Sequence, residues 1–192
     1  MNHQKKIGLI FIISILSLAG VSISYAGLTD TIGVIGTVTT AEDFDENLFE
    51  TSQTAWARMY DDPSVFTHEF PGNNWFTYIT CTPTENNQTF YLYAGQFHRV
   101  GQLNVSNDDN YLNITYDLMN GFTMQESQVH VATTLSEIPQ TAGGNPVIGN
   151  FDHKNYYDPY LQKHTVQIEW DSDWNGEELF IAAHAVVWGV FE

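Results

Sequence analysis

Basic residues are scarce in this chain of 192 residues. Six Lys and Arg stand against 23 Asp and Glu, so the formal net charge is −17. Binding to nucleic acid or to anionic lipid head groups requires clustered Lys and Arg. The composition therefore argues against both as partners and favours cations. It also predicts that any assembly of copies depends on salt or divalent ions, because like charges keep the copies apart.

Cysteine is nearly absent, since Cys81 is the only one. A single cysteine excludes a disulfide within the chain. We expect Cys81 to be a buried thiol, with a bridge between two chains as the alternative. A cysteine nucleophile needs a neighbouring base and an orienting group, and the sequence around Cys81 offers neither.

A catalytic motif is also lacking. His68-Glu69 begins like the helix of a zinc peptidase, but Gly72 stands where the second histidine should be and Pro71 would break the helix. His130 and His184 lie in apolar stretches, where we expect buried, hydrogen-bonded histidines rather than metal ligands. The sequence therefore predicts that the protein is not an enzyme.

The one long apolar run lies at the N-terminus. Lys5 and Lys6 precede fifteen mostly apolar residues (7–21), and Ser24-Tyr25-Ala26 forms a small-x-small cleavage pattern. Fifteen residues fall short of the ~20 that cross a bilayer. We expect residues 1–26 to be a signal peptide cleaved after Ala26. The mature chain would then be secreted, extracellular or at the cell surface, with no membrane anchor.

Residues 27–40 have the composition of a strand, because β-branched residues alternate with glycines and threonines. A terminal strand that glycines hold weakly in its own sheet can pair with the exposed edge of a neighbour. We call residues 27–40 the assembly strand. Its apolar residues are Leu28, Ile32, Val34, Ile35 and Val38.

The apolar signal, the SYAG junction at residues 24–27 and the segment GLTDTIGVIGTVTT at residues 27–40 resemble the TasA/camelysin type of secreted proteins. The resemblance implies a fibre-forming protein whose N-terminal strand completes the sheet of the next subunit. Its camelysin side would allow a secreted hydrolase, which the missing peptidase motif disfavours.

Residues 41–192 are predicted to form one all-β domain. We expect a short helix or turn over residues 47–59, a strand over 75–81, and a hairpin in which apolar residues of 103–105 and 112–118 alternate with polar ones. Residues 138–149 should form a long loop, and residues 165–170 should pair with 179–187. Because residues 179–190 are nearly all apolar, we expect a central strand covered on both faces.

Short strands with frequent turns favour an antiparallel β-sandwich of two sheets, of jelly-roll or Ig-like type. The C-terminal half also resembles an uncharacterised domain of secreted archaeal and bacterial proteins. The matching segments are YLYAGQ (91–96), VHVA (129–132), IPQTAGGNPVIGNFDHK (138–154) and IAAHAVV (181–187). This second resemblance implies a secreted β-sandwich and no reaction.

Two kinds of modification or ligand site are indicated. Asn87, Asn104 and Asn113 begin N-glycosylation sequons, so attached glycans are possible partners. Asp171, Asp173, Asn175 and Glu177 resemble part of a calcium loop, although Ala182 takes the place of its closing glutamate. The alternative for this segment is an acidic hairpin turn.

Aromatic residues could form a platform that stacks on sugar rings, although core positions are the more common use of such residues. The candidates are Trp56, Tyr60, Trp75, Tyr78, Tyr156, Tyr157 and Tyr160. Tyr156 to Tyr160 is the best local candidate, because we expect a loop there. The sequence thus favours a structural subunit of an extracellular filament or surface assembly, a homopolymer joined by its assembly strands. The alternative is a monomeric secreted surface module that binds carbohydrate or calcium.

Overall fold

The structure is a computed structural model that describes residues 50–191 except 63, 66–67, 84–85 and 109. The predicted signal peptide and the assembly strand, with Leu28, Ile32, Val34, Ile35 and Val38, lie outside the described residues. No helix among the described residues is long and apolar enough to cross a membrane.

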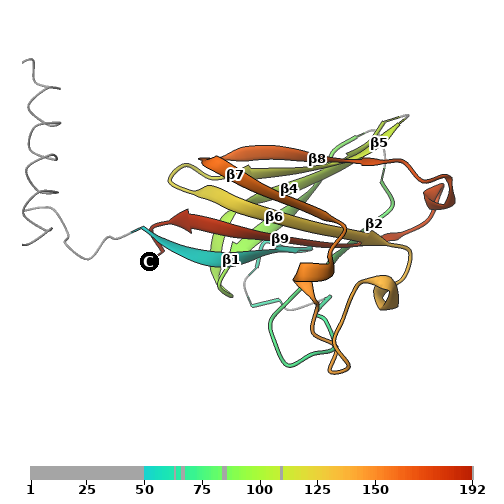
Figure 1. Ribbon diagram of the computed structural model, residues 1–192, viewed down its shortest axis with the longest axis horizontal. Helices are drawn as coiled ribbons and strands as arrows, with labels where there is room; N and C mark the ends of the chain where they lie inside the picture. The colour runs from blue at the N-terminus through green and yellow to red at the C-terminus, as the bar shows by residue number, and fades with distance from the viewer. Residues whose placement is uncertain (1–49, 63, 66–67, 84–85, 109, 192) are drawn as a thin grey trace, which may run out of the picture. The chain divides into compact units, whose positions relative to one another are not determined.

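The described residues form nine strands and three short 3-10 helices (Figure 1). The strands are β1 (Thr51–Arg58), β2 (Ile79–Cys81), β3 (Gln88–Ala94), β4 (His98–Asn107), β5 (Tyr111–Leu118), β6 (Thr123–Ala132), β7 (His153–Leu161), β8 (Lys163–Glu169) and β9 (Leu179–Gly189). The 3-10 helices are η1 (Leu135–Glu137), η2 (Ile148–Asn150) and η3 (Ser172–Trp174). The all-β prediction is confirmed.

All nine strands belong to one antiparallel sheet in the order β7-β6-β9-β1-β3-β4-β5-β8, and β2 pairs with β9. The sheet curls until its edge strands β7 and β8 face each other without pairing, which makes a nearly closed barrel. Pairing between β1 and β3 joins all the strands into this one sheet. The expected jelly-roll or Ig-like sandwich of two separate sheets is therefore not shown.

Three local predictions are wrong, one of them the loop expected over residues 156–160, which are part of β7. Residues 51–58 form β1 rather than a helix or turn, because β1 lies between β9 and β3 and pairs with both. Strand pairing across the sheet overrides the weak helical spacing of these residues. Residues 165–170 do not pair with residues 179–187, since β8 pairs with β5 instead. Both β5 and β8 have one buried face and one solvent-exposed face, so their burial patterns match each other. Strand β9 is buried almost throughout.

The hairpin prediction is confirmed. In the β4–β5 pair, Leu103 lies opposite Tyr116 and Val105 opposite Ile114, and all four side chains are fully buried. The intervening residues, such as Asn104, face the polar side of the sheet. Alternation of apolar and polar residues was therefore a sufficient signal for these two strands.

Strand β9 is central, as predicted. It pairs with β6 along one edge and with β1 and β2 along the other. Ala183 and Ala185 face the main core inside the barrel, while Ala182 faces a second apolar cluster. The buried members of that second cluster are Trp56, Phe70, Ala132, Ile138, Phe151 and Ala182. Because this cluster includes residues from the loops around Phe70 and from Ile138 to Phe151, these loops cover the outer face of β9.

Candidate functional site

The two edge strands of the sheet face each other across a cleft, which we call the seam. β7 pairs only with β6 and β8 pairs only with β5, and no other strand of the described residues lies along their outer edges. Residues 152–155 line one side of the seam and residues 164–167 the other. An unpaired strand edge presents a row of N–H and C=O groups that can pair with a further strand.

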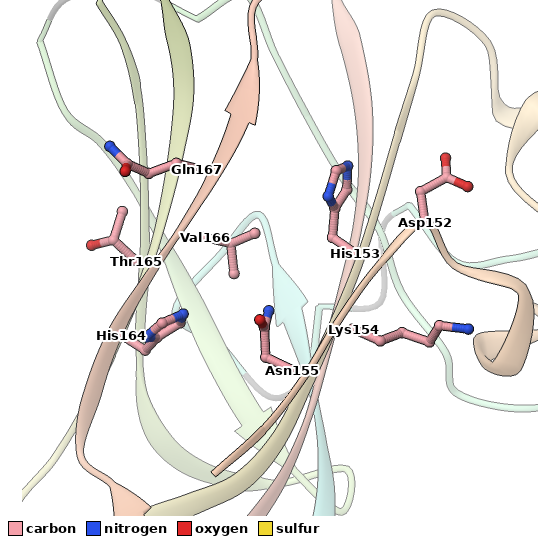
Figure 2. Close-up of a pocket in the computed structure, with 8 residues that line it drawn as sticks. All are labelled: Asp152, His153, Lys154, Asn155, His164, Thr165, Val166 and Gln167. Atoms are coloured by element: carbon pink, nitrogen blue, oxygen red, sulfur yellow. The ribbon is translucent and has the colours of Figure 1, made fainter.

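The seam is a cleft of about 380 Å³. Figure 2 shows His153, Asn155 and Val166 between the two strands, whereas Lys154 and Gln167 point away from them. The Lys154 ammonium donates a hydrogen bond to the carbonyl oxygen of Gly149. The charged end of Lys154 is therefore directed away from the cleft, so the Asp152 carboxylate is the charged group left among the lining residues.

Strands β7 and β8 follow each other in the chain with only Gln162 between them, yet they form no hairpin ladder. Pro159 in β7 has no N–H to donate to a neighbouring strand. The pairing of β7 with β6 is also irregular, because its register shifts between Met124 and Glu126. Closer to the connection between β7 and β8, the centroids of the Tyr157 and His164 rings lie 4.8 Å apart. The missing N–H and the irregular pairing of β7 leave the two strands without a backbone ladder, and these two rings are a side-chain contact across the seam.

Two histidines contribute to the electrostatics of the seam. Burial lowers the pKa of both His153 and His164, although the carboxylate of Asp152 partly offsets this for His153. Both imidazoles are therefore neutral at pH 7. With neutral rings and the Asp152 carboxylate, the seam suits a polypeptide backbone better than an anionic small ligand, because the backbone needs only hydrogen-bond partners.

Sequence reasoning missed the seam. Predicting that residues 165–170 pair with residues 179–187 concealed the free edge of β8. Pro159 within an otherwise extended stretch was the available signal, because proline in a strand sequence favours an edge position. The residues inside the seam, such as Asn155 and Val166, have no distinctive spacing that would reveal it.

The predicted calcium residues lie in one exposed turn around η3. The Asp171 carboxylate accepts a hydrogen bond from the backbone N–H of Asp173 at 3.0 Å, and the Asn175 amide oxygen accepts one from the indole of Trp170 at 3.2 Å. Among the described residues, no group of three or more His, Cys, Asp or Glu side chains could hold a metal ion. Calcium binding by these residues with Glu177 stays a prediction.

The three sequons lie in different surroundings. Asn87 is exposed just before β3. Asn104 and Asn113 are half-buried on the polar face of the sheet, and their amides are hydrogen-bonded across strands. The Asn104 oxygen accepts from the Thr89 hydroxyl at 2.8 Å, and the Asn113 oxygen accepts from the Gln167 amide at 3.0 Å. Glycosylation at all three stays a prediction.

Cys81 and the two histidines are buried, as predicted, but among the described residues the expected side-chain hydrogen bond is present for His184 and absent for Nδ1 of His130. Cys81 is a buried free thiol, and burial raises its pKa to about 12. His184 is buried, with its Nδ1 2.6 Å from the amide oxygen of Gln128. His130 is buried beside the second cluster, where its ring contacts that of Phe151. Its Nδ1 lies 3.2 Å from the Asp152 carboxylate.

The fold separates the aromatic residues that were predicted to stack together on sugar rings. Trp56 and Tyr157 are buried, whereas Tyr156 and Tyr160 are exposed on β7. Tyr160 contacts Trp188 of β9, a residue that sequence reasoning did not single out. The contact between Tyr160 and Trp188 could not be predicted from the sequence, because it depends on the strand order β7-β6-β9.

No protein-family model matches this chain, and no curated protein or solved structure matches it. The resemblances to the TasA/camelysin type and to the secreted archaeal and bacterial domain therefore stay predictions.

Proposed function

We propose that the protein is a structural subunit of an extracellular filament or surface assembly, and that it polymerises by inserting its assembly strand into the seam of a neighbouring copy. The observation that carries this proposal is the pair of unpaired strand edges that face each other in an otherwise continuous sheet. A single inserted strand would pair with both edges and close the barrel.

The assembly strand has the length and composition for this role. Fourteen extended residues reach about 46 Å at ~3.3 Å per residue, which exceeds the length of either edge strand. Alternate residues of an inserted strand would point into the core, where Val166 and Ile168 already lie. Val34 and Ile32 are suitable occupants, because they lie two residues apart and are both β-branched.

The direction of the inserted strand is constrained by the seam. Because β7 and β8 follow one another through a one-residue connection and run in opposite directions, an inserted strand must run parallel to one and antiparallel to the other. The new pairing therefore contains one parallel ladder in a sheet that is otherwise antiparallel. Parallel pairing is slightly less stable per residue, but both ladders form in one insertion.

Deletion of residues 27–40, with the signal peptide retained, tests the proposal. We expect the secreted full-length protein to form filaments under electron microscopy and the deletion variant to remain monomeric. Adding a synthetic peptide of residues 27–40 should raise the thermal midpoint of the deletion variant, because a ligand that binds only the folded state stabilises it. A scrambled peptide of the same composition is the matched control. Filaments formed by the deletion variant would show that the mechanism is wrong.

A further inference from the structure

Three aromatic side chains and one amide gather on the outer face of β6, β7 and β9, away from the seam cleft. They are Gln125, Tyr156, Tyr160 and Trp188, and we call them the aromatic platform. Tyr156 is 63% exposed and Tyr160 is 38% exposed, while Trp188 is half-buried. Large aromatic side chains exposed together on a strand surface are uncommon unless they meet a partner.

Gln125 fixes the platform from its centre. The Trp188 indole donates a hydrogen bond to the amide oxygen of Gln125 at 3.1 Å, and the Gln125 amide nitrogen donates one to the Tyr156 hydroxyl at 3.0 Å. One amide thus engages the polar atoms of two rings and sets its own orientation by donating and accepting. A ligand above the platform would then meet mainly aromatic carbon.

Two rings of the platform lie close together and nearly parallel. The Tyr160 and Trp188 centroids lie 5.8 Å apart, and the two ring planes are only 31° from parallel. Tyr156, Asp158 and Tyr160 are all exposed on β7, so a carboxylate stands on the same exposed stretch as the two tyrosines. Apolar aromatic rings with a hydrogen-bond acceptor on the same strand match a sugar ring, which has C–H faces and donor hydroxyls at its rim.

We propose that the aromatic platform binds a neutral polysaccharide by stacking Tyr156, Tyr160 and Trp188 on its pyranose rings, with hydroxyl contacts to Asp158. The formal net charge of −17 and the carboxylate at the platform disfavour uronic acid chains and phosphate-bearing polymers. The platform lies on exposed strands, which suits a polysaccharide chain that passes over it. This site is independent of strand insertion at the seam.

Calorimetric titration of the full-length secreted protein tests the proposal. The probes are neutral hexasaccharides of glucose, mannose and N-acetylglucosamine, with hexagalacturonate as the charged comparison. We expect at least one neutral probe to bind and hexagalacturonate not to bind. Tyr156→Ala and Tyr160→Ala should each weaken that binding on the order of tenfold, which corresponds to a free energy of about 1.4 kcal/mol. Tyr60→Ala is the matched control, because Tyr60 is 49% exposed but lies outside the platform.

Three results would overturn the proposal. They are no binding of any neutral probe, binding of hexagalacturonate alone, and affinities that Tyr156→Ala and Tyr160→Ala leave unchanged. Electron microscopy of Tyr156→Ala separates this site from the proposed assembly. We expect that variant to form filaments as the parent does, and a loss of filaments would identify the platform as a contact between copies instead.

Discussion

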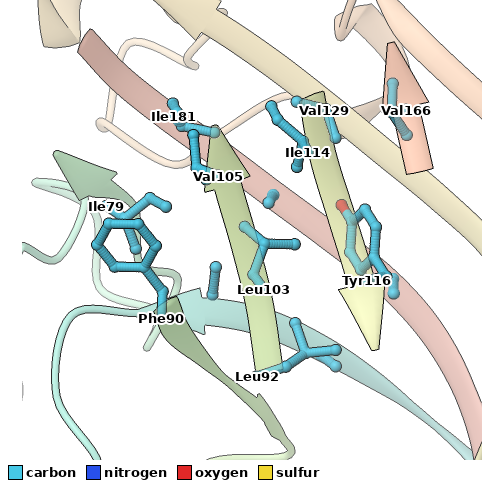
Figure 3. Close-up of a cluster of buried hydrophobic side chains, with 14 of the residues drawn as sticks. Ile79, Phe90, Leu92, Leu103, Val105, Ile114, Tyr116, Val129, Val166 and Ile181 are labelled. Atoms are coloured by element: carbon cyan, nitrogen blue, oxygen red, sulfur yellow. The ribbon is translucent and has the colours of Figure 1, made fainter. Parts of the chain in front are cut away.

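The hydroxyl of Tyr116 on β5 donates a hydrogen bond to the carbonyl oxygen of His184 on β9, 3.0 Å away. In the sheet these two strands are separated by β1, β3 and β4, so the bond crosses the interior of the barrel. Tyr116 is fully buried within the main core, near Leu103 and Ile114 (Figure 3). Burial there raises the pKa of Tyr116 well above its usual value, so the hydroxyl keeps its proton and remains a donor.

Replacing Tyr116 by phenylalanine should lower the free energy of unfolding by about 1 to 2 kcal/mol. The ring would still fill the core, but the cross-barrel hydrogen bond to His184 would be lost. Urea unfolding of parent and variant measures this change. Tyr111→Phe is the control, since Tyr111 is 38% exposed and its replacement should change the value by less than about 0.5 kcal/mol. Equal losses in both variants would contradict the role of the buried hydroxyl.

His184 should make stability depend on pH. Burial lowers its pKa to about 4, and its Nε2 has no hydrogen-bond partner among the described residues. Because the folded-state pKa lies below the unfolded value of 6.5, the folded state binds this proton less readily. The protein should keep its full stability above pH 6.5 and lose roughly 3 kcal/mol as the pH falls to 4.

The comparison with His184→Gln isolates this effect. Glutamine does not titrate, so the variant should lack the His184 contribution while it keeps those of His153 and His164. Thermal or urea unfolding of both proteins between pH 4 and 7 gives the difference in slope. Curves that stay parallel throughout this range would contradict the prediction.

Strand β9 should resist added volume. Ala183 and Ala185 are fully buried and face the main core. Leucine at either position should overpack that core and destabilise the domain by about 1 to 3 kcal/mol. Val186→Leu is the matched control, because Val186 directly follows Ala185 on β9 but is only half-buried. Thermal unfolding measures all three, and unchanged midpoints for the alanine variants would refute tight packing around β9.

If the protein is produced in a host that makes N-glycans, we expect Asn87 to carry more glycan than Asn104 or Asn113. Asn87 is exposed, whereas the amides of the other two are engaged across strands by Thr89 and Gln167. Peptide mass spectrometry of the secreted protein measures the occupancy of each site. Higher occupancy at Asn104 than at Asn87 would show that hydrogen bonding on the sheet face does not protect the asparagine.

Local alternation in the sequence was enough to predict some elements. The β4–β5 hairpin follows from Leu103, Val105 and the alternating residues of β5, and the burial of β9 follows from its continuous apolar run. Cys81 and His184 were placed correctly because their neighbours in sequence are apolar and strand-forming. These properties depend on period and burial, which residues close in sequence determine.

Properties that depend on strand order could not be predicted in the same way. Pairing of β8 with β5 rather than β9 is a choice between partners far apart in sequence. The seam and the contact between Tyr160 and Trp188 both follow from that order. Residues 51–58 show the same limit, since their position between two strands outweighs their weak helical pattern.

Each described domain has one seam, and each chain has one assembly strand, whose sequence differs from that of the seam. Under the proposed function the contact between copies is therefore head-to-tail, and such contacts continue indefinitely unless their rotation closes a ring. Every filament would end in one vacant seam and one unused strand. A copy without residues 27–40 still has a seam, which would bind the free assembly strand at one filament end. This copy has no assembly strand of its own, so the next copy could not be added there. Small amounts of it should act as a chain terminator and shorten the filaments in proportion to its share of the mixture.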